Sequence, residues 1–161
     1  MSKVIWIDRY NTGIAEIDTQ HRQIVDYLNQ LNDARMRGSV KQVKDVIEGI
    51  VDYTLSHFSF EEALMAEAKY PFAGAHKSVH ESFIKRVEKF QVRFKDGEDI
   101  FEEFYDVLKR WLVNHIQRDD AAYVRSIKAH LASLNKVEPV VVDTKLQGSW
   151  ITRAVKKFFW A

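Results

Sequence analysis

The sequence contains no cysteine, which excludes a disulfide framework, a thiolate metal site and a cysteine nucleophile. Any metal ion must therefore be held by histidine, aspartate or glutamate. The chain of 161 residues fits one ordinary domain that can bury a core. An excess of charge is also lacking, because 24 Lys and Arg residues against 23 Asp and Glu residues leave a net charge of +1. This balance gives no whole-chain electrostatic reason to expect nucleic acid as a partner.

Long hydrophobic runs are missing as well. The N-terminal stretch MSKVIWIDRY reaches charged residues too soon to hold the apolar core of a signal peptide. No apolar run approaches the length of a membrane span. We therefore expect a cytoplasmic protein.

Apolar residues recur at helical spacing in four long segments. Asp18 or Thr19 is the expected cap of the first, and only two prolines interrupt the chain. The four segments span about residues 19–37, 40–64, 76–94 and 101–115. No alternating strand pattern competes with them. The sequence predicts an all-α domain, an antiparallel up-down four-helix bundle with short loops, to which a C-terminal amphipathic tail helix is added.

Histidines occupy the inward face of this predicted bundle. Five of the six histidines fall on the apolar stripes, and every expected helix contributes at least one: His21, His57, His76, His80 and His115. A buried imidazole without a hydrogen-bond partner costs on the order of 1–3 kcal/mol, and few polar partners lie on those stripes. A metal centre satisfies all of them at once, because imidazoles suit first-row transition metals. His130, the sixth, reads as a surface or packing residue.

Carboxylates lie near these histidines. Glu61 follows His57 by about one helical turn and is costly to bury unless it is paired or bound to metal. In HIQRDD, Asp119 and Asp120 follow His115 by four and five residues. Five residues turn an ideal helix about 140° away from the histidine, so Asp120 reaches the same point only if the helix breaks, bulges or turns. On spacing alone, the two aspartates remain alternatives.

The order of these motifs resembles that of a known family. The four motifs IDTQH, HFSFE, HKSVH and HIQRDD, preceded by NTGIAEID, look like the seven-ligand signature of the bacterial hemerythrins. The resemblance covers about residues 5–134. It selects Asp120 over Asp119, which is then expected to be a solvated neighbour.

The resemblance implies a non-haem di-iron centre that binds dioxygen reversibly. The implied ligands are His76, His80 and His115 for one iron, His21 and His57 for the other, and Glu61 and Asp120 as bridges. The second iron then keeps an open coordination position. The expected cofactors are two iron ions with an oxo or hydroxo bridge, and dioxygen is the expected ligand. An apolar lining that excludes water is expected from Leu28, Phe58, Phe83, Trp111 and Leu112.

Two functional classes remain open at this point. The first is carriage, storage or local supply of dioxygen, without enzymatic activity, because paired Glu-x-x-His motifs of the oxidising di-iron enzymes are missing. The alternative is an oxygen or redox sensor in which the site controls docking of the tail. Both classes need the same site.

The end of the chain departs from the minimal family pattern. We expect a bundle domain over residues 1–136, a linker over 137–148 that contains Pro139, and a tail over 149–161. The tail sequence SWITRAVKKFFWA places aromatic and aliphatic residues on one helical face and basic residues on the other. This pattern is typical of a peripheral membrane anchor or of a helix that fills a groove on a protein partner, although it could also pack on its own bundle.

Overall fold

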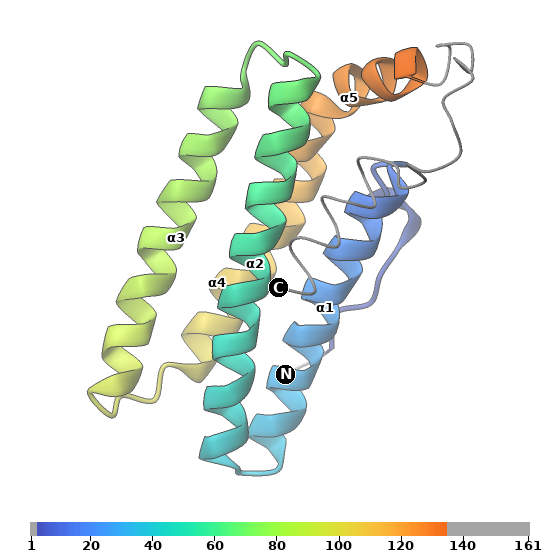
Figure 1. Ribbon diagram of the computed structural model, residues 1–161. Helices are drawn as coiled ribbons and strands as arrows, with labels where there is room; N and C mark the ends of the chain where they lie inside the picture. The colour runs from blue at the N-terminus through green and yellow to red at the C-terminus, as the bar shows by residue number, and fades with distance from the viewer. Residues whose placement is uncertain (1–2, 135–161) are drawn as a thin grey trace, which may run out of the picture.

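The computed structural model describes residues 3–134 of the chain. Its long helices are α1 (Ala15–Met36), α2 (Val40–Glu67), α3 (Ala73–Lys95) and α4 (Phe101–Asn114). Short loops join successive helices at alternate ends, so that neighbours run antiparallel (Figure 1). No strand occurs within residues 3–134. The predicted all-α class and the up-down bundle are confirmed.

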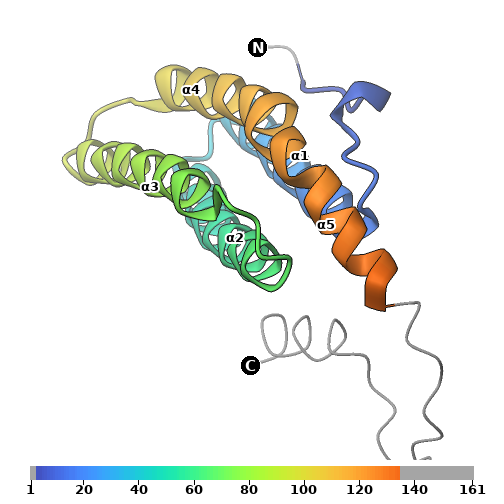
Figure 2. The same ribbon diagram turned by 90° about the horizontal axis from the view of Figure 1, so that it is seen from above.

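Short elements precede and follow the bundle. A 3-10 helix, η1 (Asp8–Tyr10), comes before α1, and a π-helix, η2 (His115–Asp120), leads from α4 into α5 (Ala121–Leu134). Seen from above, α5 runs on from α4 and lies beside the start of α1 (Figure 2). The fourth helical segment is therefore longer than its predicted stripe and changes its winding in the middle.

The start of α1 differs from the prediction. The helix begins at Ala15, so neither Asp18 nor Thr19 is its cap. Thr19 donates its hydroxyl to the carbonyl oxygen of Ala15 at 2.8 Å. The buried carboxylate of Asp18 accepts the backbone N–H and hydroxyl of Thr12 at 2.6 and 2.8 Å, and the backbone N–H of Gly13 at 3.0 Å. Asp18 thus fixes the preceding loop against the first turn instead of capping the helix.

The start of α2 agrees with the prediction. Ser39 caps this helix, since its hydroxyl oxygen accepts the backbone N–H of Gln42 at 3.2 Å. Gly38 has φ of 70°, a left-handed conformation that only glycine adopts without cost, and it separates α1 from α2. The turn between the two helices is therefore short and specified locally.

Two apolar clusters flank a polar layer inside the bundle. The larger cluster draws on α1 to α4, and the smaller one consists of Ile14, Ile17, Phe60, Leu64, Met65, Tyr123 and Ile127. On α1, His21 lies between Ile17 of the smaller cluster and Ile24 of the larger one. On α2, Glu61 lies between Phe58 and Leu64 in the same way. The polar residues of the two helices therefore lie at the same level along the bundle axis.

The predicted linker over residues 137–148 and the predicted tail helix over 149–161 lie outside the described residues. Within the part of the chain that is described, none of the helices combines the length and apolar character that crossing a membrane requires.

Candidate metal centre

The bundle brings all seven predicted site residues to one buried point. None of their side chains belongs to a residue more than 6% exposed: His21, His57, Glu61, His76, His80, His115 and Asp120. They come from α1, α2, α3 and η2. His130 lies half-buried on α5, outside this group.

The π-helix explains how both His115 and Asp120 point inward. In this winding each N–H bonds the carbonyl five residues back, so residues five apart come to share a face. Asp120 is fully buried, and its Oδ1 lies 3.1 Å from Nε2 of His115. Asp119 lies on the outer side, 38% exposed, with its Oδ2 3.0 Å from Nδ1 of the same histidine. Asp119 is therefore not merely the predicted solvated neighbour, because it contacts the back of the imidazole.

Three imidazoles converge on one side of the site, here called the three-histidine side: His76, His80 and His115. Nε2 of His80 lies 3.0 Å from Nε2 of His76 and 3.1 Å from Nε2 of His115. Oε2 of Glu61 is 3.3 Å from Nε2 of His80. Ligand atoms of these four residues all lie within 4.8 Å of one another, a spacing that suits one metal ion.

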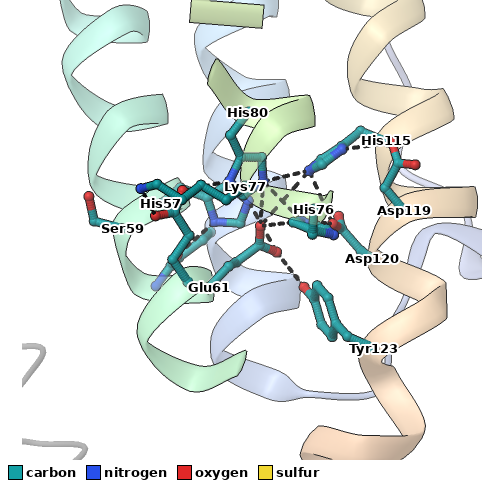
Figure 3. A network of polar contacts seen from close by, with 12 residues as sticks. His57, Ser59, Glu61, His76, Lys77, His80, His115, Asp119, Asp120 and Tyr123 are labelled. Carbon is teal, nitrogen blue, oxygen red and sulfur yellow. Dashed lines mark hydrogen bonds and ion pairs between the residues drawn. The ribbon is translucent and has the colours of Figure 1, made fainter. Parts of the chain in front are cut away.

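The other two imidazoles, His21 and His57, form the two-histidine side. Their Nε2 atoms lie 3.8 and 3.5 Å from Oε1 of Glu61, and the three residues form a second group of possible ligands. Oδ2 of Asp120 lies 3.1 Å from Nε2 of His21, while its Oδ1 faces the three-histidine side. Glu61 occupies the centre of the polar contacts (Figure 3). The two carboxylates therefore stand between the two sides.

Buried donor atoms without partners show that this cluster suits cations. Nε2 of His21 and His57, Oε2 of Glu61 and both carboxylate oxygens of Asp120 have no hydrogen-bond partner among the described residues. Each such atom costs about 1–3 kcal/mol when it is left unmatched. Histidine nitrogens and carboxylate oxygens are also the donors that first-row transition metals such as iron accept. The donor set therefore fits two metal ions placed between these residues.

Polar side chains contact the outer nitrogen, Nδ1, of several imidazoles, and two of these side chains were not predicted from the sequence. Nδ1 of His57 is 2.8 Å from Oε1 of Gln20, and Nδ1 of His80 is 3.2 Å from Oε1 of Glu62. Such contacts fix the tautomer and leave Nε2 free for a metal. Both residues sit next to a predicted ligand in sequence, but the histidine that each contacts lies on another helix. No local spacing therefore indicated these pairs.

Tyr123 is a further residue that the sequence analysis did not identify. It is 1% exposed, lies on α5 and donates its hydroxyl to Oε1 of Glu61 (Figure 3). Its position three residues after Asp120 is the only signal that could have indicated it. The bond fixes the orientation of the Glu61 carboxylate from the side of the smaller apolar cluster.

Electrostatics differ strongly across the site. Burial lowers the pKa of His57 to about 3, which keeps its imidazole neutral and its lone pair available. Burial also lowers the pKa of His115, but the hydrogen bond with Asp119 and the nearby carboxylates of Glu61 and Asp120 outweigh it and raise the value to about 10. For Glu61, burial raises the pKa, whereas the surrounding imidazoles, His57 first, bring it well below its usual range. Burial and the nearby charge of Glu61 raise the pKa of Asp120.

Aromatic rings cover the three-histidine side. Phe58 stacks on His80 with ring centroids 3.8 Å apart, and Trp111 stacks on His115 at 4.3 Å. Phe83 stacks on the far face of this arrangement, 3.8 Å from Trp111. Of the apolar lining expected from the sequence, Leu28, Phe58, Phe83 and Leu112 belong to the larger apolar cluster, and Trp111 packs against it. This wall excludes water from one flank of the site.

Comparisons with known proteins agree with this geometry. Residues 12–127 match the family described as Hemerythrin HHE cation binding domain. The bacteriohemerythrins of Pseudomonas aeruginosa and Stenotrophomonas maltophilia are 46% and 47% identical over 159 residues, which cover 99% of this chain and of each relative. The bacteriohemerythrin of Methylococcus capsulatus is 30% identical over 115 residues, 71% of this chain and 88% of that one. The first two matches thus extend beyond residue 134, whereas the third is shorter.

A solved structure gives the same picture for the fold. The crystal structure of wild-type hemerythrin superposes with a TM-score of 0.74 at 26% identity, covering 78% of this chain and 98% of that one. The family match spans most of the chain, and the identity with two bacterial relatives extends over nearly all of it. The chain belongs to the hemerythrin family, and its function is reversible dioxygen binding at a non-haem di-iron centre.

Proposed function

We propose that seven residues of this chain hold the two irons and that the protein uses them to carry, store or locally supply dioxygen. The observation that carries the assignment is the overlap of the two ligand groups at Glu61. A residue shared by two groups has the position of a bridging carboxylate. Asp120 supports the assignment independently, because its two oxygens face His21 and His115.

The proposed ligands divide unequally between the two irons. His76, His80 and His115 would hold one ion, and His21 and His57 would hold the other, with Glu61 and Asp120 shared. The first ion has one more protein ligand than the second. The two-histidine side would therefore be the one with room for dioxygen. When bound, the two irons would supply the electrons that dioxygen takes up on binding and returns on release.

The protein itself orients the ligands and keeps water away. Gln20, Glu62 and Asp119 contact the outer nitrogens of three imidazoles, and Tyr123 contacts Glu61. Stacked rings cover His80 and His115, and the larger apolar cluster borders the polar layer. Exclusion of water slows loss of the electrons to side reactions, which a carrier requires.

A carrier is a better fit to this site than an oxidising enzyme. Tyr123 is an ionisable side chain that touches the proposed ligands without being one of them, and burial raises its pKa well above 10. A group with so high a pKa holds its proton firmly and is a poor acid for cleaving bound dioxygen. No observation on residues 3–134 favours the sensing alternative over carriage.

Iron content and the visible spectrum test this proposal directly. We expect two irons per chain and a visible absorption band that appears when the reduced protein meets dioxygen and disappears when dioxygen is removed. The readout separates carriage from oxidation, because a carrier regains its reduced spectrum without added electrons. One iron per chain, or no oxygen-dependent band, would refute the proposal.

We further propose a bundle domain over residues 1–136 in the cytoplasm, with residues 149–161 attaching it to a membrane surface or a membrane-associated protein. The support is the sequence of the tail, in which helical spacing places aromatic and aliphatic residues on one face and Arg153, Lys156 and Lys157 on the other. Each basic residue near an anionic surface adds roughly 1 kcal/mol, so binding should weaken as salt rises. Co-sedimentation with anionic vesicles should therefore be stronger for the full chain than for a chain ending at Gly148. Equal sedimentation would exclude the lipid version.

A further inference from the structure

The groups behind the imidazoles differ in charge between the two sides of the centre. On the three-histidine side, the outer nitrogens of His80 and His115 contact carboxylates, those of Glu62 at 3.2 Å and Asp119 at 3.0 Å. On the two-histidine side, the outer nitrogen of His57 contacts the neutral amide of Gln20 at 2.8 Å. Nδ1 of His21 has no hydrogen-bond partner among residues 3–134. Negative charge is thus concentrated behind one side only.

We infer that Glu62 and Asp119 are positioning residues that act through His80 and His115 and make the three-histidine side the more electron-donating half of the centre. The inference rests on the ligand assignment proposed above. A carboxylate that accepts the outer N–H of an imidazole fixes the ring and raises the basicity of the nitrogen on the metal. An amide oxygen fixes the ring in the same way but adds no charge. Gln20 therefore orients His57 without increasing its electron donation.

The two carboxylates are not equivalent. Oε2 of Glu62 lies 2.6 Å from Nζ of Lys77, so a positive charge offsets part of its effect on His80 (Figure 3 shows Lys77 beside this histidine). Among residues 3–134, no Lys or Arg side chain forms an ion pair with Asp119, whose carboxylate contacts His115. Both side chains are partly exposed, 25% and 38%, and solvent therefore damps both effects. Asp119 is the stronger of the two.

The asymmetry has a consequence for dioxygen. Dioxygen binding draws electrons from the irons, so donors that stabilise the ferric state favour it. Carboxylates behind the saturated iron supply this stabilisation without occupying space at the open position. The neutral contact behind His57 leaves the open iron free of added negative charge. The residues that increase electron donation to the irons thus lie on one side, and the position at which dioxygen would bind lies on the other.

Substitutions that change charge but keep hydrogen bonding test the inference. Glu62→Gln and Asp119→Asn retain an oxygen acceptor, whereas Lys77→Gln removes the offsetting cation. Glu67→Gln, at the exposed end of α2, is the matched control. The readouts are the midpoint potential of the iron-loaded protein and the rate at which a chelator removes iron. Neither is a measure of oxygen-binding activity.

The expected shifts have opposite signs, which a merely structural role would not produce. Asp119→Asn and Glu62→Gln should move the potential to more positive values, Asp119→Asn by more, and Lys77→Gln should move it to more negative values. Iron loss should quicken for the two carboxylate variants by up to roughly tenfold, the lower end of the range usual for groups that hydrogen-bond a metal ligand. Glu67→Gln should change neither readout.

The two levels of the hypothesis fail in different ways. Two irons and an oxygen-dependent band in the unaltered chain, together with unchanged potentials in all variants or shifts of one common sign, would overturn the inference and leave the proposed function standing. Fewer than two irons in the unaltered chain would overturn the proposed function, and the inference with it.

Discussion

The two sides of the centre are built by different means. On the three-histidine side, Nε2 of His80 lies 3.0 and 3.1 Å from the Nε2 atoms of His76 and His115, and aromatic rings stack on two of the imidazoles. The two-histidine side has its rings in edge contact, with centroids 4.7 Å apart, and their Nε2 atoms have no hydrogen-bond partner among the described residues. The three-histidine side thus has three imidazoles, two of them covered by aromatic rings, whereas the two-histidine side offers only two imidazoles.

If the proposed ligands hold the two irons, one bundle would give two like ions different surroundings. Each helix contributes at a fixed height, but α3 supplies two imidazoles one turn apart and η2 supplies both an imidazole and a carboxylate. Helices α1 and α2 supply one imidazole each to the other side. Under the proposed ligand assignment, this unequal supply would leave the open position for dioxygen on the two-histidine side. Variants that act on both sides or on one side alone test the comparison.

Loss of Glu61 should have the largest effect, because this carboxylate stands in both ligand groups. We expect Glu61→Ala to reduce the iron content from two toward zero and to abolish the oxygen-dependent band. The change also removes the acceptor of the Tyr123 hydroxyl. Iron analysis checks the result, with Glu67→Ala as a control on the same helix. One iron retained in Glu61→Ala would show that the sides bind independently.

Asp120 and Asp119 form a natural pair for the next test, because Asp120 contacts both sides and Asp119 contacts only His115. Asp120→Ala should lose iron or autoxidise rapidly. Asp119→Ala should keep two irons and the oxygenated spectrum, with a shifted potential. Spectra recorded after oxygenation compare the two. If Asp119→Ala lost the band and Asp120→Ala kept it, the assignment of the bridge would be wrong.

The sequence was sufficient to predict which site residues share a face of the same helix. Residues one turn apart, such as His57 with Glu61 or His76 with His80, share a face in any α-helix, and their burial followed from the apolar stripe around them. The irregular winding near Asp120 was also predictable, because five residues do not fit a regular turn. Its form as a π-helix required the structure.

Contacts between helices could not be predicted in this way. Gln20 meets His57 across 37 residues, and Tyr123 meets Glu61 across 62. These pairs depend on the relative rotation and height of two helices, which a stripe on one helix does not define. The predicted cap of α1 was wrong for a related reason. Asp18 had a cap residue's chemistry, but its carboxylate bonded to the loop at Thr12 instead.

Removal of an aromatic ring should affect the walled side through water access. Phe58 is 2% exposed and stacks on His80, so Phe58→Ala should cost about 3–5 kcal/mol of stability and should also quicken autoxidation. Phe101 belongs to the same apolar cluster at the other end of the bundle and is 4% exposed. Phe101→Ala should lose similar stability without faster autoxidation. Denaturant unfolding measures the stability of the two variants, and the decay of the oxygenated band measures their autoxidation rates. Equal autoxidation rates would contradict the role of the stacked aromatic rings in excluding water.

The smallest expected effect is a pH dependence that differs between the sides. In the iron-free protein the pKa of His115 is raised to about 10, so this imidazole carries a proton at neutral pH that iron must displace. The pKa of His57 is lowered to about 3, so no proton competes there. Iron affinity of the three-histidine side should therefore rise with pH between about pH 6 and pH 8, by up to roughly tenfold per unit for a single proton.

Chelator competition across this range measures the slope, and Asp119→Asn supplies the control. The asparagine keeps an oxygen acceptor but removes the negative charge with which Asp119 raises the pKa of His115, so its slope should be flatter than that of the unaltered chain. The free energy of unfolding of the iron-free protein should also depend on pH. The stability that comes from protonated His115 is complete below the usual histidine pKa and is lost as pH rises toward about 10. An affinity independent of pH in both proteins would mean that His115 is already neutral when iron arrives, and the electrostatic contrast between the two sides would then rest on Glu62 and Asp119 alone.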